Sequence, residues 1–203
     1  MNSNPRQKDY FNEKAKVWDE ITIHDLEKVQ YIIELQRIQT GDKILDVGTG
    51  TGILIPFYEK YLRDGKVVAI DYSEKMIAIA RSKYPEKNHP MISFVVSDVY
   101  DLNYYDEFDL VMCYSCFPHF VDKPLALQIL SKALKRGGSL VIAHSDSAGK
   151  INSVHMNTGA EIKNDFLPNM EQLHSMIKEN GLAVTFTRDD ERYFICIARK
   201  LDE

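Results

Sequence analysis

The fold is decided by one stretch near the first quarter of the chain, Ile44-Leu45-Asp46-Val47-Gly48-Thr49-Gly50-Thr51-Gly52. Its first half is an apolar run typical of a buried strand, and its second half places glycine at every other position. Glycine adopts the dihedral angles of a tight turn and lets a ligand approach a backbone that carries no Cβ. A helical pattern follows, so free N–H groups at its start are available to a carboxylate. The stretch predicts a strand, a ligand-binding turn and a helix.

Further apolar runs follow at 67–70, 92–96, 110–113 and 140–144, after the first at 43–47. In each run successive residues are apolar rather than alternate ones, which is typical of strands buried on both faces of a parallel sheet. Helices are expected between them at 53–62, 73–84 and 123–134, the second with Ser73 as its N-cap. Turn or helix-end signals include Arg136-Gly137-Gly138. This alternation predicts an α/β fold with a doubly wound sheet.

The two ends of the chain and one late segment have a different pattern. Residues 182–187 and 193–198 are rich in strand-forming residues and flank a charged turn, which predicts an antiparallel hairpin. Amphipathic helical patterns extend to about Leu35, and the polar segment 145–168 lacks clear periodicity. We expect one domain over 1–203, with a helical N-terminal cover at 1–40 and a lid-like insertion at 145–168.

Composition excludes several classes of protein. A net charge of −5 argues against a broad electrostatic surface for nucleic acid or an anionic membrane. No apolar run approaches the roughly 18–20 residues that span a bilayer, and the polar start leads into no signal sequence. Three cysteines, all in or beside apolar runs, make no disulfide framework. These features predict a cytoplasmic protein with a small-molecule partner, no nucleic acid and no membrane; they leave its oligomeric state open.

Two acidic residues follow later strands of the predicted sheet. Asp71 comes directly after 67–70, and Asp98 follows 92–96. An acid in the first position accepts hydrogen bonds from the ribose hydroxyls of an adenosine, and an acid in the second accepts one from an adenine amine. Ordinary capping or loop roles are the alternatives. Because open α/β sheets bind ligands at the carboxyl ends of their strands, we expect the glycine turn and both acids to form one site.

A nicotinamide-dinucleotide site is a rival interpretation of the glycine turn. Its fingerprint, G-x-G-x-x-G, requires glycine at position 53, where this chain has Ile53, and the spacing present is G-x-G-x-G. A dehydrogenase usually needs a second domain as well, for which little chain is left. A nucleotide-binding titration distinguishes this alternative.

The ordered motifs resemble those of the class I, Rossmann-like S-adenosylmethionine-dependent methyltransferases of small-molecule type. Residues 45–52 match the family's first motif, Asp71 falls on its ribose-binding acid, and Asp98-Val99 on its adenine-binding position. Residues 108–111 resemble the fourth-strand motif, and 134–140 the segment before strand five. Residues 10–19 are similar to the N-terminal helix that partly covers the cofactor in small-molecule members.

The resemblance implies a three-layer αβα fold with a mostly parallel, seven-stranded sheet whose last strand is antiparallel. It implies S-adenosylmethionine as cofactor and S-adenosylhomocysteine as product. The candidate cofactor-binding residues are Asp46, Gly48, Thr49, Gly50, Gly52, Asp71, Tyr72, Met76, Asp98, Val99 and Cys113.

Acceptor chemistry is expected in the loop after the strand at 110–113. This loop lacks the Asn/Asp-Pro-Pro-aromatic signature of enzymes that methylate amino groups of adenine or glutamine. His119 is the candidate catalytic base, because a histidine ordinarily titrates near neutral pH; a structural hydrogen bond is the alternative. The candidate acceptor-binding residues are Trp18, Tyr114, His119, His144 and His155.

Metal or redox chemistry has little support in the sequence. Cys113-x-x-Cys116 has no second cysteine pair to complete a zinc site, and structural cysteines are the simpler interpretation. Although three histidines are expected near the pocket, no His-x-x-x-His pair or carboxylate cluster accompanies them. No metal is therefore expected.

The sequence predicts methyl transfer from S-adenosylmethionine by in-line displacement to an unidentified, small-molecule acceptor. The acceptor atom is left open among oxygen, nitrogen, sulfur and carbon. The alternative is a non-catalytic S-adenosylmethionine-binding protein with a regulatory or partner role. Degraded motifs would favour that alternative, whereas the cofactor motifs here are intact.

Overall fold

The computed structural model describes residues 4–201, so residues 1–3 and 202–203 of the predicted domain lie outside the described part. Within 4–201, seven strands form one sheet in the order β3-β2-β1-β4-β5-β7-β6. The strands are β1 (Lys43–Val47), β2 (Lys66–Asp71), β3 (Ile92–Val96), β4 (Phe108–Tyr114), β5 (Leu134–His144), β6 (Leu182–Asp189) and β7 (Phe194–Lys200). Strands β1–β5 pair in parallel, and β7 is antiparallel to both of its neighbours. The predicted doubly wound sheet with an antiparallel last strand is confirmed.

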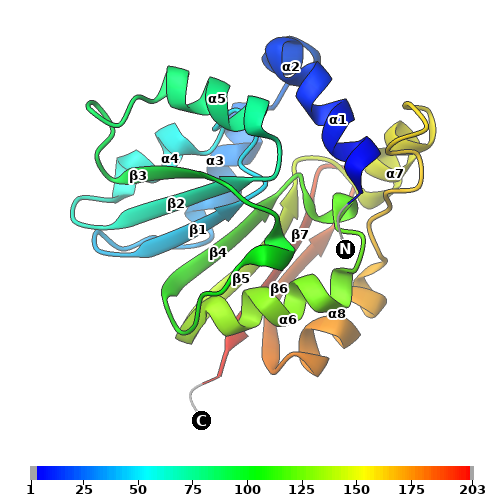
Figure 1. The fold of residues 1–203 in the computed structure, drawn as a ribbon. Coiled ribbons are helices and arrows are strands. Elements are labelled where there is room, and N and C mark those ends of the chain that lie inside the picture. The colour runs from blue at the N-terminus through cyan, green and yellow to red at the C-terminus, as the bar shows by residue number, and fades with distance from the viewer. Residues whose placement is uncertain (1–3, 202–203) are drawn as a thin grey trace.

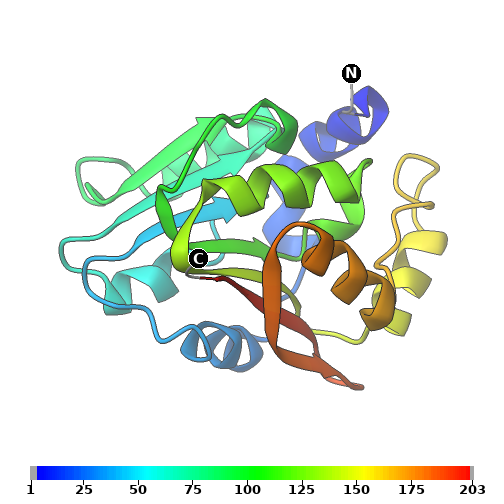
Figure 2. The same ribbon diagram turned by 90° about the horizontal axis from the view of Figure 1, so that it is seen from below.

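Helices cover both faces of this sheet. Helices α3 and α4 pack on one face, and α6 and α8 lie side by side on the other (Figures 1 and 2). The helices are α1 (Pro5–Lys14), α2 (Trp18–Ile21), α3 (Leu26–Glu34), α4 (Ile55–Tyr61), α5 (Glu74–Lys83), α6 (Lys123–Ala133), α7 (Ala148–Met156) and α8 (Met170–Glu179). Short 3₁₀ turns lie at Ala15–Val17, Val99–Asp101 and Phe117–His119. The arrangement is the expected three-layer sandwich.

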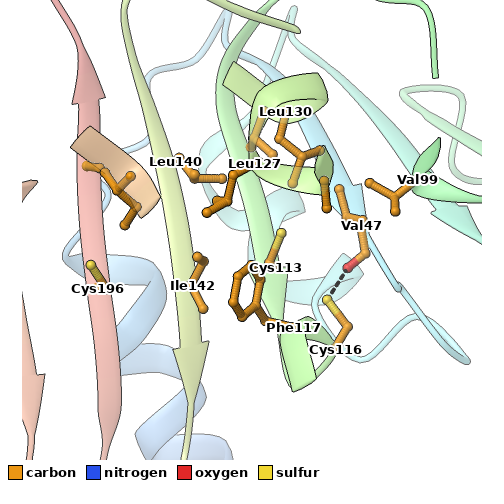
Figure 3. Close-up of a cluster of buried hydrophobic side chains, with 14 of the residues drawn as sticks. Val47, Val99, Cys113, Cys116, Phe117, Leu127, Leu130, Leu140, Ile142 and Cys196 are labelled. Carbon is orange, nitrogen blue, oxygen red and sulfur yellow. Dashed lines mark hydrogen bonds between the residues drawn. The ribbon is translucent and has the colours of Figure 1, made fainter. Parts of the chain in front are cut away.

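The core explains why successive strand residues are apolar. On one face of the sheet, Leu140 and Ile142 of β5 meet Leu127 and Leu130 of α6 (Figure 3). The residues between them point to the other face of the sheet. Val141, for example, belongs to a second buried cluster with residues of α3 and α4. A strand between two helical layers buries both of its faces, so it contains no alternating polar residues.

The predicted helices form with small differences at their ends. Ser73 caps α5, because its hydroxyl accepts a hydrogen bond from the Met76 amide at 3.2 Å, as expected. Helix α4 begins at Ile55 rather than at residue 53. The reason is the glycine turn, in which Gly52 has a φ of +89° and the chain reaches helical geometry two residues later.

Residues 136–138, expected to mark a turn or a helix end, instead belong to β5, which begins at Leu134 directly after α6. The early part of the strand is irregular. Gly137 has a φ of +72°, and the register with β4 shifts between Phe108 and Leu110. A Cβ on Gly138 would lie only 2.9–3.2 Å from three carbonyl oxygens, so glycine here allows close backbone packing inside the sheet.

The segment 145–168, expected to be irregular, contains helix α7, which is capped by Ser147. Helix α7 has no buried residue, so its sequence carries no apolar stripe by which a helix is recognised. The remainder, 157–168, is a turn-rich loop. Among the helices of residues 4–201, none is both long and apolar enough to cross a bilayer.

We predict that Gly48→Ala lowers the free energy of unfolding by about 1–3 kcal/mol, as expected for a strained backbone. Gly48 has a φ of +67°, and an added Cβ would lie 2.5 Å from the Cβ of Cys116. Urea denaturation measures the change. Gly41→Ala is the matched control, because nothing lies within 4 Å of its added Cβ. Equal stability of the two variants would contradict the prediction.

Candidate functional site

A cavity of about 390 Å³ lies at the carboxyl ends of β1–β5, bordered by α1. This is the edge at which α/β sheets bind ligands, and the volume is within the range of small-molecule sites. Most of the predicted site residues line it. They are Trp18, Gly48, Thr49, Gly50, Asp71, Tyr72, Met76, Asp98, Val99, Tyr114, His119, His144 and His155.

Three residues expected to contact the cofactor do not line the cavity. Cys113 is fully buried in the apolar cluster between β4 and α6 (Figure 3). Gly52 packs against the ring of Tyr84, from which an added Cβ would lie only 2.9 Å away. Asp46 lies behind the turn, where its carboxylate accepts hydrogen bonds from the hydroxyls of Thr49 at 2.7 Å and Tyr58 at 3.2 Å. Asp46 therefore positions the turn.

Asp71 joins the glycine turn to the start of α5. Its Oδ2 accepts a hydrogen bond from the Gly50 amide at 2.9 Å, and its Oδ1 accepts one from the Ser73 amide at 2.8 Å. Burial raises the pKa of Asp71 to about 6, and these two amide hydrogen bonds oppose the shift. Each carboxylate oxygen accepts more than one hydrogen bond, so each retains capacity for a ribose hydroxyl.

The next part of the cavity combines apolar surface with one further acid. Met76 and Val99 are buried and line the cavity beside Asp98. Asp98 caps the 3₁₀ turn by accepting a hydrogen bond from the Tyr100 amide at 3.1 Å, and burial raises the pKa of its carboxyl. Apolar walls with a single acceptor suit a flat purine that carries an exocyclic amine.

Helix α1 encloses this part of the site with aromatic side chains. The ring of Phe11 lies 5.5 Å from that of Trp18, 6.0 Å from that of Tyr72 and 5.0 Å from the imidazole of His119. Phe11 also packs in a buried cluster with Met76 and with Ile162 of the late loop. The N-terminal helix and the loop at 157–168, far apart in sequence, therefore meet beside the same cavity (Figure 1).

The charge of the cavity wall discriminates between classes of ligand. Within residues 4–201, the wall contains the carboxylates of Asp19, Asp71 and Asp98 and no lysine or arginine. A pyrophosphate would place two negative charges among these acids with no cationic side chain to compensate. A cationic sulfonium ligand has the opposite sign and is favoured there. The wall therefore argues against a nicotinamide dinucleotide.

Two polar residues that the sequence analysis missed hold His119. Oδ2 of Asp165, a residue of the late loop, lies 2.8 Å from Nδ1 of His119. Both side chains are largely buried. Gln7 donates from its amide nitrogen to Asp165 Oδ2 at 2.6 Å and to the His119 carbonyl at 3.2 Å, and accepts from the Tyr72 hydroxyl at 2.9 Å. Neither residue lies in a recognisable motif, so no sequence signal pointed to them.

The tautomer of His119 follows from this contact. An ionised carboxylate only accepts hydrogen bonds, so the proton of the neutral imidazole is on Nδ1. Nε2 then carries the free lone pair. His155 lies close by, with its ring 4.9 Å from that of His119 and its Nδ1 2.5 Å from the Asp165 carbonyl oxygen. Asp165 thus orients both histidines.

His144 at the end of β5 is unusual because neither of its ring nitrogens has a hydrogen-bond partner although the side chain is only 2% exposed. Burial lowers its pKa to about 3, so its imidazole is neutral at physiological pH. Tyr114, at the end of β4, donates to the Ser145 hydroxyl at 3.0 Å and lies 3.0 Å from His24 Nδ1. Among residues 4–201 no three histidine, cysteine or acidic side chains are grouped to hold a metal ion.

A family model described as a methyltransferase domain matches residues 38–193. The chain belongs to this methyltransferase family. The match begins before β1 and ends just before β7, and it includes the glycine turn and both acids. The resemblance to class I S-adenosylmethionine-dependent methyltransferases is confirmed.

Curated relatives and solved structures agree with this assignment. The ubiquinone/menaquinone biosynthesis C-methyltransferase UbiE of Teredinibacter turnerae is 31% identical over 59% of this chain and 49% of its own length. The demethylmenaquinone methyltransferase of Thermotoga maritima is 27% identical over 76% of both chains. A SAM-dependent methyltransferase structure from Aquifex aeolicus superposes with a TM-score of 0.71 at 20% identity, covering 94% of this chain and 98% of the other. The chain spans about half the length, or less, of the first curated relatives it matches.

We predict that Asp71→Asn lowers the affinity for S-adenosylhomocysteine about 5- to 150-fold, because the neutral amide loses charge-assisted hydrogen bonds to the ribose. The wild-type affinity should fall as the pH decreases through about 6, where Asp71 takes up a proton, and the variant should lack this dependence. Calorimetry between pH 5 and 8 measures both effects. Asp101→Asn, exposed next to the site, is the control. Unchanged affinity in Asp71→Asn would remove Asp71 from the site.

Proposed function

We propose that this protein transfers the methyl group of S-adenosylmethionine to a small-molecule acceptor. The observation that carries the proposal is the cavity at the strand ends. Its wall contains the glycine turn, Asp71 and Asp98 in the order expected for a nucleoside site, and its described residues include no lysine or arginine. The enclosed volume suits a small acceptor better than a nucleic acid. The names of two relatives, which refer to quinone biosynthesis and to demethylmenaquinone, support an acceptor of this size.

Residues at the ends of different strands bind different parts of the ligands. The Gly48–Gly50 backbone and Asp71 hold the nucleoside half at β1 and β2, and Asp98 holds the base at β3. When bound, S-adenosylmethionine supplies a methyl group on a positively charged sulfur, which is a good leaving group. The side chains beyond it, on β4 and β5, need to orient the acceptor and exclude water. His119, held by Asp165, is placed to take a proton from the acceptor.

Binding and turnover measurements test the proposal together. Calorimetry should show binding of S-adenosylmethionine and S-adenosylhomocysteine but not of NAD. Release of S-adenosylhomocysteine with a panel of small metabolites should identify an acceptor, and RNA and DNA should accept no methyl group. Cofactor binding without turnover on any acceptor would favour the non-catalytic alternative. The cytoplasmic location stays a prediction, consistent with three buried, free cysteines.

We also propose that α1 and the loop at 157–168 form a cover that opens for ligand exchange. They contact each other through Gln7 and Asp165, and both contact the nucleoside side of the cavity through Tyr72 and Met76. A cover that opens admits ligands, and its closure removes water from the sulfonium.

We predict that S-adenosylhomocysteine slows amide hydrogen exchange in α1 and at 157–168 as well as in the glycine turn. The physical reason is that the ligand fills the space under Phe11 and Ile162 and stabilises the closed arrangement. Exchange in the β6–β7 hairpin, which lies outside the cavity wall, is the internal control. Protection confined to the glycine turn would contradict the cover.

A further inference from the structure

The acceptor half of the cavity, at the ends of β4 and β5, differs in chemistry from the nucleoside half. The acids Asp71 and Asp98 follow β2 and β3, on the other side of β1. Asp19 also lines the cavity, but it is paired with Lys83 at 2.8 Å and bound by the Thr51 hydroxyl. The polar side chains left for an acceptor are mainly imidazoles and hydroxyls. They include His24, Tyr114, Ser115, His119, His144 and His155.

This polar set is surrounded by apolar and aromatic surface. Phe11, Phe120, Ile151 and Val154 line the same cavity. A charged acceptor would lose its hydration here without gaining an ion pair, since the described wall has no lysine or arginine and its acids are engaged elsewhere. An acceptor with an uncharged, flat apolar body is therefore favoured.

The side chain of His144 indicates which polar group the acceptor carries. Its imidazole is neutral, so it offers one donor and one acceptor, and both are buried in the wall without a partner. A buried polar group without a partner costs free energy that a ligand recovers by pairing with it. A hydroxyl group both donates and accepts, whereas a phosphate or carboxylate only accepts. His119 presents a second imidazole with a free Nε2 in the same wall.

We propose that the methyl acceptor is an uncharged aromatic molecule with a free hydroxyl, which binds between His119 and His144. This inference rests on the proposed methyltransferase function and deepens it. In the reaction the hydroxyl proton passes to Nε2 of His119, and the oxygen forms a bond with the methyl carbon. The carbon–sulfur bond breaks, and its electron pair stays on sulfur in S-adenosylhomocysteine. The Asp165 carboxylate stabilises the imidazolium until its proton leaves to water.

The acceptor class is tested with matched probes. 2-Naphthol, 2-naphthyl phosphate and phosphoethanolamine are each incubated with S-adenosylmethionine, and S-adenosylhomocysteine and the methylated product are measured by mass spectrometry. We expect O-methylation of 2-naphthol and none of the two phosphates. Calorimetry in the presence of S-adenosylhomocysteine should show binding of 2-naphthol but not of 2-naphthyl phosphate or phosphoethanolamine.

The roles of the two histidines are tested by substitution. His119→Asn and Asp165→Asn should lower kcat for 2-naphthol at least 100-fold and 10-fold respectively, as removal or misorientation of a general base does. With 4-nitrophenol, which ionises without help at mildly alkaline pH, both losses should shrink. His144→Phe should weaken 2-naphthol binding at least 10-fold. His89→Asn is the matched control and should change nothing, because His89 contacts Glu59 and does not line the cavity.

S-adenosylhomocysteine binding, measured for every variant, separates folding and cofactor binding from acceptor recognition. Methylation of phosphoethanolamine, or failure of 2-naphthol to bind or react in a protein that binds S-adenosylhomocysteine, would overturn the acceptor class and leave the methyltransferase function intact. Absence of S-adenosylhomocysteine binding in the wild type would overturn the proposed function itself. Equal losses with 2-naphthol and 4-nitrophenol in Asp165→Asn would show that Asp165 does not act through the base.

Discussion

The hydrogen bonds of one buried carboxylate, Asp71, fix the geometry on which the cavity depends. Its two oxygens bind the Gly50 amide after β1 and the Ser73 amide at the start of α5. Gly48 and Gly50 have the positive φ values that this turn requires, and the missing side chain of Gly48 leaves room for Cys116. Helix α5 in turn supports α1, since Asn12 accepts a hydrogen bond from the Ser73 hydroxyl at 2.7 Å. The glycine turn, the second strand and the N-terminal helix are thus connected through neighbouring polar contacts.

A second connection joins parts of the chain that are far apart in sequence. Gln7 near the start contacts Asp165 near the end, and both contact His119 in the middle. None of these side chains belongs to the sheet. Gln7 and His119 line the cavity at the carboxyl ends of its strands, and Asp165 contacts both. The part of the site around His119 is therefore assembled from loops and a helix at the end of the sheet, which is common for binding sites in α/β proteins.

The part of the cavity wall at β1–β3 could be predicted from sequence because its signals are local. A strand, a glycine turn and an acid after each following strand have fixed spacings, and each spacing has a steric or hydrogen-bonding cause. Asp46, Gly52 and Cys113, which were also expected to contact the cofactor, do not line the cavity. A position in a strand or turn does not say which way a side chain points. Asp165 and Gln7 were missed because their roles arise from contacts between distant segments. Helix α7 was missed because it buries no residue, so no apolar period marks it.

The direction of β7 has a practical consequence for handling the protein. Because β7 runs against its neighbours, Lys200 lies beside the beginning of β5, at the end of the sheet opposite the cavity. Pro5, by contrast, begins the helix that borders the cavity. Anything attached beyond β7, such as a purification tag, a fluorophore or a surface for immobilisation, is therefore kept a full sheet length from the ligands, whereas an attachment ahead of α1 lies next to them.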